Sequence, residues 1–178
     1  MRYVTDPARG TPPDAQGDAD PERIARTILL RRLSAAPRTR SELRADLLRR
    51  GVPEDVADRV LDRFAEVGLI DDTAYAQLWV ESRRRTRGSA TALLRQELRS
   101  KGVSDDDAAL ALEGIDDDAE RARAVRLVQV KLRSMDRLDP EVRARRLISL
   151  LMRRGYRQGT AVSVVTEVLG ESPGHDVD

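Results

Sequence analysis

Apolar positions in this 178-residue chain recur in three stretches that align on Gly51, Gly102 and Gly155, which follow one another at nearly equal intervals. In each stretch a leucine stands eight residues before the glycine and another stands four before it, and an apolar residue follows directly. These positions hold Leu43, Leu94 and Leu147; Leu47, Leu98 and Leu151; and Val52, Val103 and Tyr156. An internal repeat of this length predicts stacked copies of one supersecondary unit.

The same register continues on both sides of each glycine. Two apolar columns precede the leucines and three follow the glycine, each at a constant distance from it. The columns are Ile24, Tyr75 and Val128; Ile28, Trp79 and Leu132; Ala57, Ala108 and Ala161; Leu61, Leu112 and Val165; and Phe64, Ile115 and Val168. Spacings of three, four and seven mark the buried stripes of amphipathic helices. The pattern therefore predicts an all-α fold of three tandem three-helix, helix-turn-helix-like repeats.

Helix-start and helix-stop residues divide the chain into repeats at 21–69, 70–114 and 115–170. In the first repeat, Pro21 is suited to a first helical turn, Thr39 and Glu42 fit a capping box, and Gly51 is suited to a left-handed helix end. In the second, Asp71 is expected to cap a helix running to Arg87, and Ser89 to cap the next one.

In the third repeat, a first helix is expected from the Asp116–Asp118 run to Met135, and Asp139, Pro140 and Glu141 form a strong start for the second. The last segment contains VSVVTEV, which by itself resembles a strand. Because its apolar residues fall in the repeat columns, we predict a helix over 158–169.

The two ends of the chain differ from its centre. Residues 1–20 and 171–178 are rich in Pro, Gly and Asp without apolar periodicity, and we predict that both are disordered. Their net charges are −2 and −3, so the segment between them holds 30 basic and 24 acidic side chains, although the whole chain is only +1. A basic centre with acidic ends favours an anionic partner or a surface that the ends can shield.

The sequence offers few residues that could act in catalysis or bind a metal. The chain has no cysteine, its one histidine is His175 in the acidic end, and no phosphate-binding glycine loop is present. The aspartate runs 105–107 and 116–118 are better explained as helix starts than as cation ligands. We therefore expect a non-enzyme without cofactor or metal. With no apolar leader or membrane span, we also expect it to be cytoplasmic.

Basic residues provide the candidate binding site. Most lie in residues 82–103, and the others end the second helix of the third repeat: Arg83, Arg84, Arg85, Arg87, Arg95, Arg99, Lys101, Arg153 and Arg154. Cations at helix ends such as Arg50, Lys101 and Arg154 are explained as well by the helix dipole as by a partner. The dense Arg83–Arg87 run favours a partner, because like charges packed together repel. Tyr75 and Trp79 are expected in the core rather than as a stacking surface for bases.

Residues 69–103 resemble the central motif of the RecX family, regulators of the RecA recombinase. The similarity lies in an ordered combination of elements: Leu69, Ile70, Asp71, Asp72, Tyr75, Ala76, Trp79, Val80, Arg83, Arg87, Gly88, Leu94, Glu97, Leu98, Lys101, Gly102 and Val103. Trp79 departs from the phenylalanine more frequent in the family, and the third repeat matches only loosely.

The resemblance implies a monomeric, elongated and curved array that binds the RecA filament on DNA in its helical groove. It further implies that the protein lowers the ATPase and strand-exchange activities of RecA and can promote disassembly of RecA filaments. Two mechanisms stay open: contact with the recombinase itself, or contact of the arginines with single- or double-stranded DNA. A helix-turn-helix transcription factor is a third, weaker hypothesis, since no recognition helix is marked.

Overall fold

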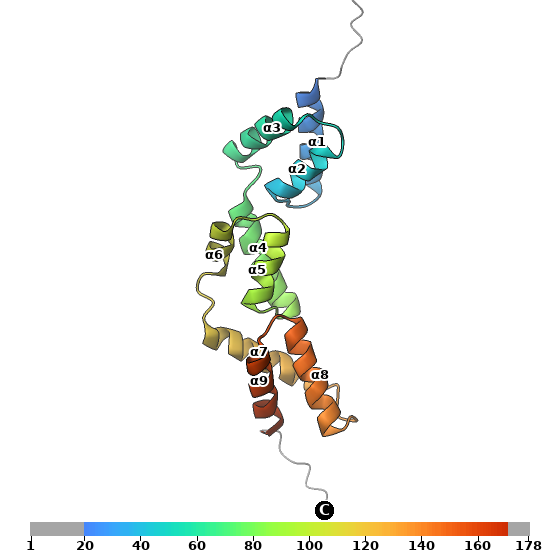
Figure 1. Ribbon diagram of the computed structural model, residues 1–178, viewed down its shortest axis with the longest axis vertical. Helices are drawn as coiled ribbons and strands as arrows, with labels where there is room; N and C mark the ends of the chain where they lie inside the picture. Colours follow the sequence, from blue (N-terminus) through green and yellow to red (C-terminus); the bar gives the residue numbers. More distant parts are fainter. Residues whose placement is uncertain (1–19, 171–178) are drawn as a thin grey trace, which may run out of the picture.

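The computed structural model describes residues 20–170, which form α-helices and no strand (Figure 1). The helices are α1 Pro21–Ala35, α2 Arg40–Leu48, α3 Glu54–Glu66, α4 Asp72–Arg87, α5 Thr91–Ser100, α6 Asp105–Leu112, α7 Asp117–Leu132, α8 Pro140–Arg153 and α9 Gln158–Gly170. The all-α prediction is confirmed, and the β-branched segment VSVVTEV is helical within α9. Of the segments predicted to be disordered, 1–20 and 171–178, only Asp20 lies in this described part, where it is the N-cap of α1.

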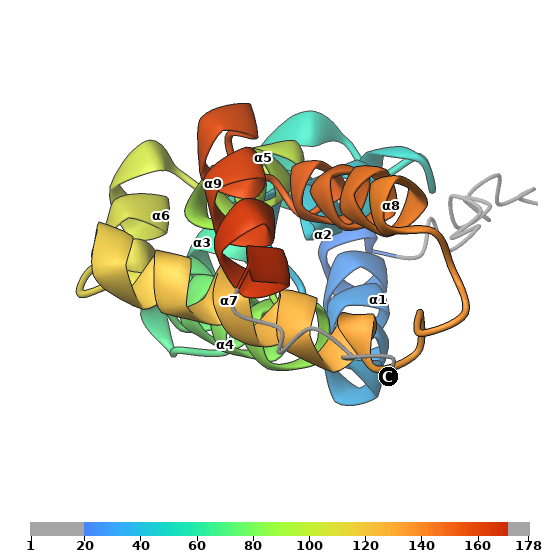
Figure 2. The same ribbon diagram turned by 90° about the horizontal axis from the view of Figure 1, so that it is seen from below.

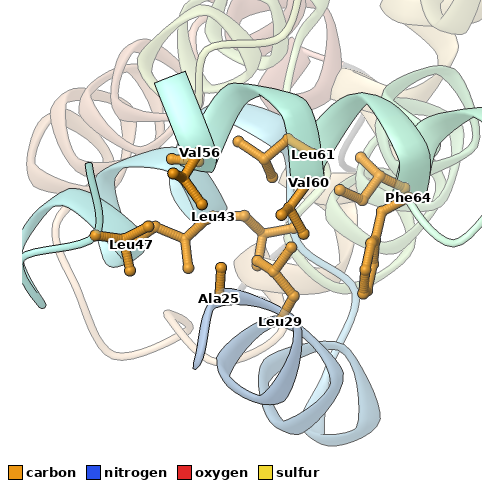
Figure 3. Close-up of a cluster of buried hydrophobic side chains, with 11 residues drawn as sticks. Ala25, Leu29, Leu43, Leu47, Val56, Val60, Leu61 and Phe64 are labelled. Carbon is orange, nitrogen blue, oxygen red and sulfur yellow. The ribbon is translucent and has the colours of Figure 1, made fainter. Parts of the chain in front are cut away.

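The helices group in threes along an elongated molecule, with α1–α3 at one end and α7–α9 at the other (Figure 1). Each group encloses its own buried cluster: residues 25–70 form the first, 75–112 the second, and 124–168 with Ala90 the third. Figure 3 shows the first cluster, where Leu29 of α1 and Leu43 of α2 meet Val60 and Phe64 of α3. We call the three groups units 1, 2 and 3. The exact bounds 21–69, 70–114 and 115–170 stay a prediction.

The apolar columns occupy these cores with one exception. Ile24 is 39% exposed, whereas the equivalent Tyr75 and Val128 are buried. The buried residues of α1 are instead Ala25 and Leu29, so the stripe of this helix is turned by one residue. Ile24 therefore lies at the edge of the core.

The repeated glycines end α2, α5 and α8 in the same way. Gly51, Gly102 and Gly155 have φ values of 78°, 75° and 89°. The amide after each glycine donates to the carbonyl of the leucine four residues before it; the pairs are Val52–Leu47, Val103–Leu98 and Tyr156–Leu151, at 3.2, 3.1 and 3.1 Å. This is the left-handed helix end that glycine favours, in which the following apolar side chain packs back onto the helix.

Helix starts follow the sequence except at α5, although Asp139 precedes α8 without a side-chain cap hydrogen bond. Thr39 and Glu42 form the expected capping box, and Asp71 accepts from the amide of Ala74. The prediction for Ser89 is wrong: Ala90 is the N-cap, and the buried Ser89 hydroxyl has no hydrogen-bond partner. The amide of Thr91 instead donates to Glu120 of α7, so a carboxylate from unit 3 takes the capping role.

The first helix of unit 3 is also shorter than expected. It ends at Leu132 rather than Met135, because the amides of Ser134 and Met135 turn back to the carbonyls of Lys131 and Leu132. Met135 lies in the loop that leads to α8, and its side chain is buried in the core of unit 3.

Neighbouring units meet through the same repeated glycine. In unit 2, the Lys101 carbonyl accepts from the Thr39 hydroxyl of unit 1 at 2.7 Å. In unit 3, the Arg154 carbonyl accepts from the amide of Ala90 in unit 2 at 2.8 Å. Thr39 and Ala90 occupy the same column of the repeat, because each is the N-cap of the second helix of its unit. The end of the second helix of one unit thus docks on the start of the second helix of the unit before it.

The junction between units 2 and 3 also contains a buried tyrosine. The Tyr156 hydroxyl donates to the carbonyl of Gly88 at 3.0 Å, and the side chain is 4% exposed. Burial, with the Glu120 carboxylate as a second cause, raises the pKa of Tyr156 to about 12. The phenol is therefore held protonated where a solvated tyrosine already ionises.

We expect Tyr156→Phe to lower the free energy of unfolding by about 1 kcal/mol at pH 8, because one buried hydrogen bond is lost. Above pH 10 the difference in free energy of unfolding between the wild type and this variant should narrow. The unfolded wild type ionises at its ordinary pKa of 10.0 whereas the folded protein waits until about 12, so the wild type loses up to about 1.4 kcal/mol per pH unit in this window. Urea unfolding of both proteins at pH 8 and pH 11 measures the gap. A gap that stays constant would contradict the assignment.

Candidate partner-binding surface

The centre of unit 2 is a stack of aromatic and cationic side chains on α4 and α5. The rings of Tyr75 and Trp79 are stacked with centroids 6.0 Å apart. The Arg83 guanidinium lies 4.1 Å from the centroid of the Trp79 ring, and the Lys101 ammonium lies 4.4 Å from it. Cations at such distances are attracted to the electron-rich ring face. Family-motif residues that are distant in sequence therefore meet in one cluster.

Glu97 of α5 contacts both Trp79 and Arg83 in this cluster. Its carboxylate accepts from the Trp79 indole N–H at 2.8 Å and lies 3.2 Å from Nε of Arg83. Lys101 in turn pairs with Glu42 of unit 1 at 2.8 Å. The Arg83 and Lys101 side chains are only 24% and 21% exposed. These two candidates are thus engaged within the array, Arg83 in holding α4 to α5 and Lys101 at the first junction.

Unit 1 contains the same arrangement in the same columns. Asp46, five residues before Gly51 as Glu97 is before Gly102, pairs with Arg32 at 2.7 Å. Arg32 is the counterpart of Arg83. An acid on the second helix that binds an arginine on the first is therefore a repeated structural element of units 1 and 2.

Arg84 and Arg85 lie on another part of α4 from Arg83. Together with Arg123 of α7 they line a hollow of about 480 Å³, with Val80 and Ile115 among its apolar residues. Arg123 donates to the carbonyl of Arg84 at 2.8 Å. Burial and the nearby Arg123 guanidinium lower the pKa of Arg84. Two cations brought together in a partly enclosed hollow favour the binding of an anion.

The hollow also contains acidic side chains, but they leave Arg84 unpaired. Glu81 is 3.9 Å from Arg85, and both of these side chains are more than two-thirds exposed. Within residues 20–170, no carboxylate lies within ion-pair distance of Arg84 or of the exposed Arg87 at the end of the helix. We call Arg84, Arg85, Arg87 and Arg123 the junction arginines. Arg123 was not among the residues predicted from the sequence. The one feature of the sequence that sets it apart is that a charged residue stands in the repeat column that holds the apolar Ile70 in unit 2.

The remaining candidates are dispersed. Arg99 pairs with Asp105 at 3.0 Å, while Arg95 lines a different hollow with Asp116, Asp117 and Asp118, so these two arginines do not act as one basic face. Arg154 is half-buried at the second junction, and Arg153 is exposed on α8. The predicted residues therefore fall into an internal cluster, the junction arginines and separate exposed positions.

Comparison with known proteins shows which family shares this architecture. Residues 25–64 match the model for the first three-helix domain of RecX, and residues 71–112 match that for the second. A regulatory protein RecX from Mycobacterium ulcerans is 47% identical over 155 residues, which cover 86% of this chain and 90% of the relative. The chain belongs to the RecX family. A RecX from Thermobifida fusca is 45% identical over 165 residues, covering 91% of this chain and 89% of that protein.

Solved RecX structures share the fold. A crystal structure of RecX from Lactobacillus salivarius aligns with a TM-score of 0.71 at 21% identity, over 84% of this chain and 97% of that one. A second RecX crystal structure aligns with a TM-score of 0.69 at 26% identity, over 86% of this chain and 73% of that one. The relatives are named as regulatory proteins, and a regulatory role is what the family establishes for this chain. None of the helices in residues 20–170 has the length and apolar content needed to span a bilayer.

Proposed function

We propose that this chain binds the RecA recombinase assembled on DNA and lowers its ATPase and strand-exchange activities. The observation that supports this most strongly is family membership over most of the chain, together with the match of residues 71–112 to the second three-helix domain of RecX. We further propose that it acts as a monomer in the cytoplasm and is not an enzyme.

The shape of the molecule supports binding to a repeating partner. Three units arranged along one axis offer successive contacts to successive subunits of a filament (Figure 1). Arg84, Arg85 and Arg123 line one hollow, and Arg87 is exposed at the end of α4, so the junction arginines offer positive charge to a partner that spans units 2 and 3. We assign them to the contact with the recombinase, through acidic side chains on its surface.

Sedimentation of filaments tests the proposal directly. RecA assembled on poly(dT) with a non-hydrolysable ATP analogue is pelleted in the presence of the chain, with poly(dT) alone and free RecA as separate controls. We expect more of the chain in the pellet with filaments than with poly(dT) alone, and none with free RecA. Its absence from the filament pellet would contradict the proposed function.

A further inference from the structure

The three units differ in how their basic side chains are neutralised. In unit 1, arginines throughout the unit lie within 4.0 Å of a carboxylate; they are Arg26, Arg32, Arg38, Arg40, Arg44, Arg49, Arg50, Arg59 and Arg63. Between residues 116 and 170 only Arg121 has such a partner, Glu167. Unit 3 therefore presents positive charge that the described part of the chain does not neutralise.

Four of these cations line one groove. Lys131 at the end of α7 and Arg145, Arg146 and Arg153 of α8 surround a hollow of about 440 Å³, which Met135, Ser149 and Leu150 complete. All four basic side chains are exposed, and none has an ion-pair partner among the described residues. We call this hollow the unit 3 groove. Figure 2 shows α8 at the edge of the unit.

The repeat explains why this groove has no anion of its own. The column that holds Asp46 in unit 1 and Glu97 in unit 2 holds Leu150 in unit 3. The column of their partners Arg32 and Arg83 holds Asp136. The internal acid–arginine pair is thus missing, and a leucine among cations stands in the position of the acid.

The same groove includes a face that the other units use for docking. The columns nine and ten residues before the glycine hold Ser41 and Glu42 in unit 1, which meet Gly102 and Lys101 of unit 2. In unit 2, Leu93 of these columns meets Gly155 of unit 3. In unit 3 the columns hold Arg145 and Arg146, and no described unit follows. α8 also begins one turn earlier than α2 and α5 relative to the glycine. Within residues 20–170, these columns of unit 3 therefore present a basic face where units 1 and 2 have a junction.

We propose that the unit 3 groove binds the phosphate backbone of a single nucleic acid strand. Arg145, Ser149 and Arg153 are spaced by four residues, so they follow one side of α8 over about 12 Å, enough to meet more than one phosphate. Guanidinium groups match phosphate oxygens in a two-point geometry, and the serine hydroxyl is a further donor. Leu150, which is partly exposed, adds apolar surface for sugars or bases. A strand with a charge on every nucleotide matches four clustered cations, and the guanidinium groups among them suit phosphate oxygens.

The groove is tested without recombinase, so its failure and that of the proposed function are distinguishable. Binding of the full chain to a fluorescent oligo(dT) is followed by anisotropy over a salt series. We expect the triple variant Arg145→Gln, Arg146→Gln and Arg153→Gln to weaken binding at least about tenfold and to reduce the slope of log affinity against log salt by about 2. The matched control, Arg26→Gln, Arg59→Gln and Arg63→Gln, loses the same charge from unit 1 and should bind like the wild type.

Three results would overturn the proposal: no binding of oligo(dT) by the wild type at low salt, equal losses in both triple variants, or a labelled polyglutamate peptide that binds the groove more tightly than oligo(dT). Circular dichroism of both variants checks that the helices are intact. If the groove variant fails to fold, the single change Arg153→Gln replaces it, with a smaller expected loss of about threefold and a slope change of about 0.7, and Arg59→Gln is then its control.

Discussion

Gly155→Ala is expected to destabilise the chain by about 3 kcal/mol, whereas Gly51→Ala should cost about 1 kcal/mol. Both glycines have a positive φ, so each alanine is strained in the left-handed region. At Gly155 a Cβ atom would also lie 2.5 Å from Cβ of Leu93 and 3.0 Å from its backbone nitrogen. A Cβ at Gly51 meets nothing within 4 Å. The difference between the two variants therefore measures the junction between units 2 and 3.

Urea unfolding followed by circular dichroism gives the two free energies. Hydrogen exchange at the amide of Ala90, which donates to Arg154 across the junction, reports whether Gly155→Ala opens that contact. Equal destabilisation by the two alanines would show that the glycines act only as helix ends.

The junction between units 1 and 2 allows a control in which a second substitution relieves the clash caused by the first. A Cβ at Gly102 would lie 2.3 Å from both Cβ and Oγ of Ser41, while Cα of Ser41 is 3.8 Å away. Removing the serine side chain thus removes the clash but leaves the strained φ. Gly102→Ala combined with Ser41→Gly should therefore recover stability that the same serine change does not recover in Gly51→Ala.

Much of the fold could be predicted because its determinants are local and repeated. The glycine columns predict the helix ends, and the leucines four and eight residues before them lie in the cores. The register also resolves α9, whose β-branched residues alone resemble a strand. Local propensity is weak there, and burial of Val164, Val165 and Val168 on one side decides the helix.

Sequence patterns do not reveal the contacts that a side chain makes with another helix. Ser89 is a good capping residue by type, yet Glu120 of unit 3 reaches the start of α5 instead. Arg83 belongs to a basic run, yet it packs on Trp79 beside Glu97, which lies on the next helix. Spacing indicates which residues share a face of one helix, but it does not indicate what lies opposite. The columns nine and ten residues before each glycine are polar, apolar or basic in turn, and only the contacts of Gly102 and Gly155 show that they form the junctions.

Removing the junction arginines of α4 is expected to weaken the proposed inhibition of RecA at least about tenfold. The variant Arg84→Gln, Arg85→Gln and Arg87→Gln takes three cations from the surface between units 2 and 3. Arg83 is left in place because its loss would break the pair with Glu97 and disturb the unit. Since Arg84 lies beside Arg123 and has no ion pair in the described part of the chain, its removal should leave the helices stable. The unit 1 triple variant at Arg26, Arg59 and Arg63 is again the control of equal charge.

The measurement that tests the central claim most directly is the steady-state ATPase of RecA on single-stranded DNA, titrated with this chain below one molecule per RecA. The proposed function predicts strong inhibition at substoichiometric amounts by the wild type and the unit 1 variant. The α4 triple variant should require at least about ten times more protein. An ATPase rate that the wild type leaves unchanged would contradict regulation of the filament, and equal inhibition by all three proteins would contradict the assignment of the contact to the junction arginines.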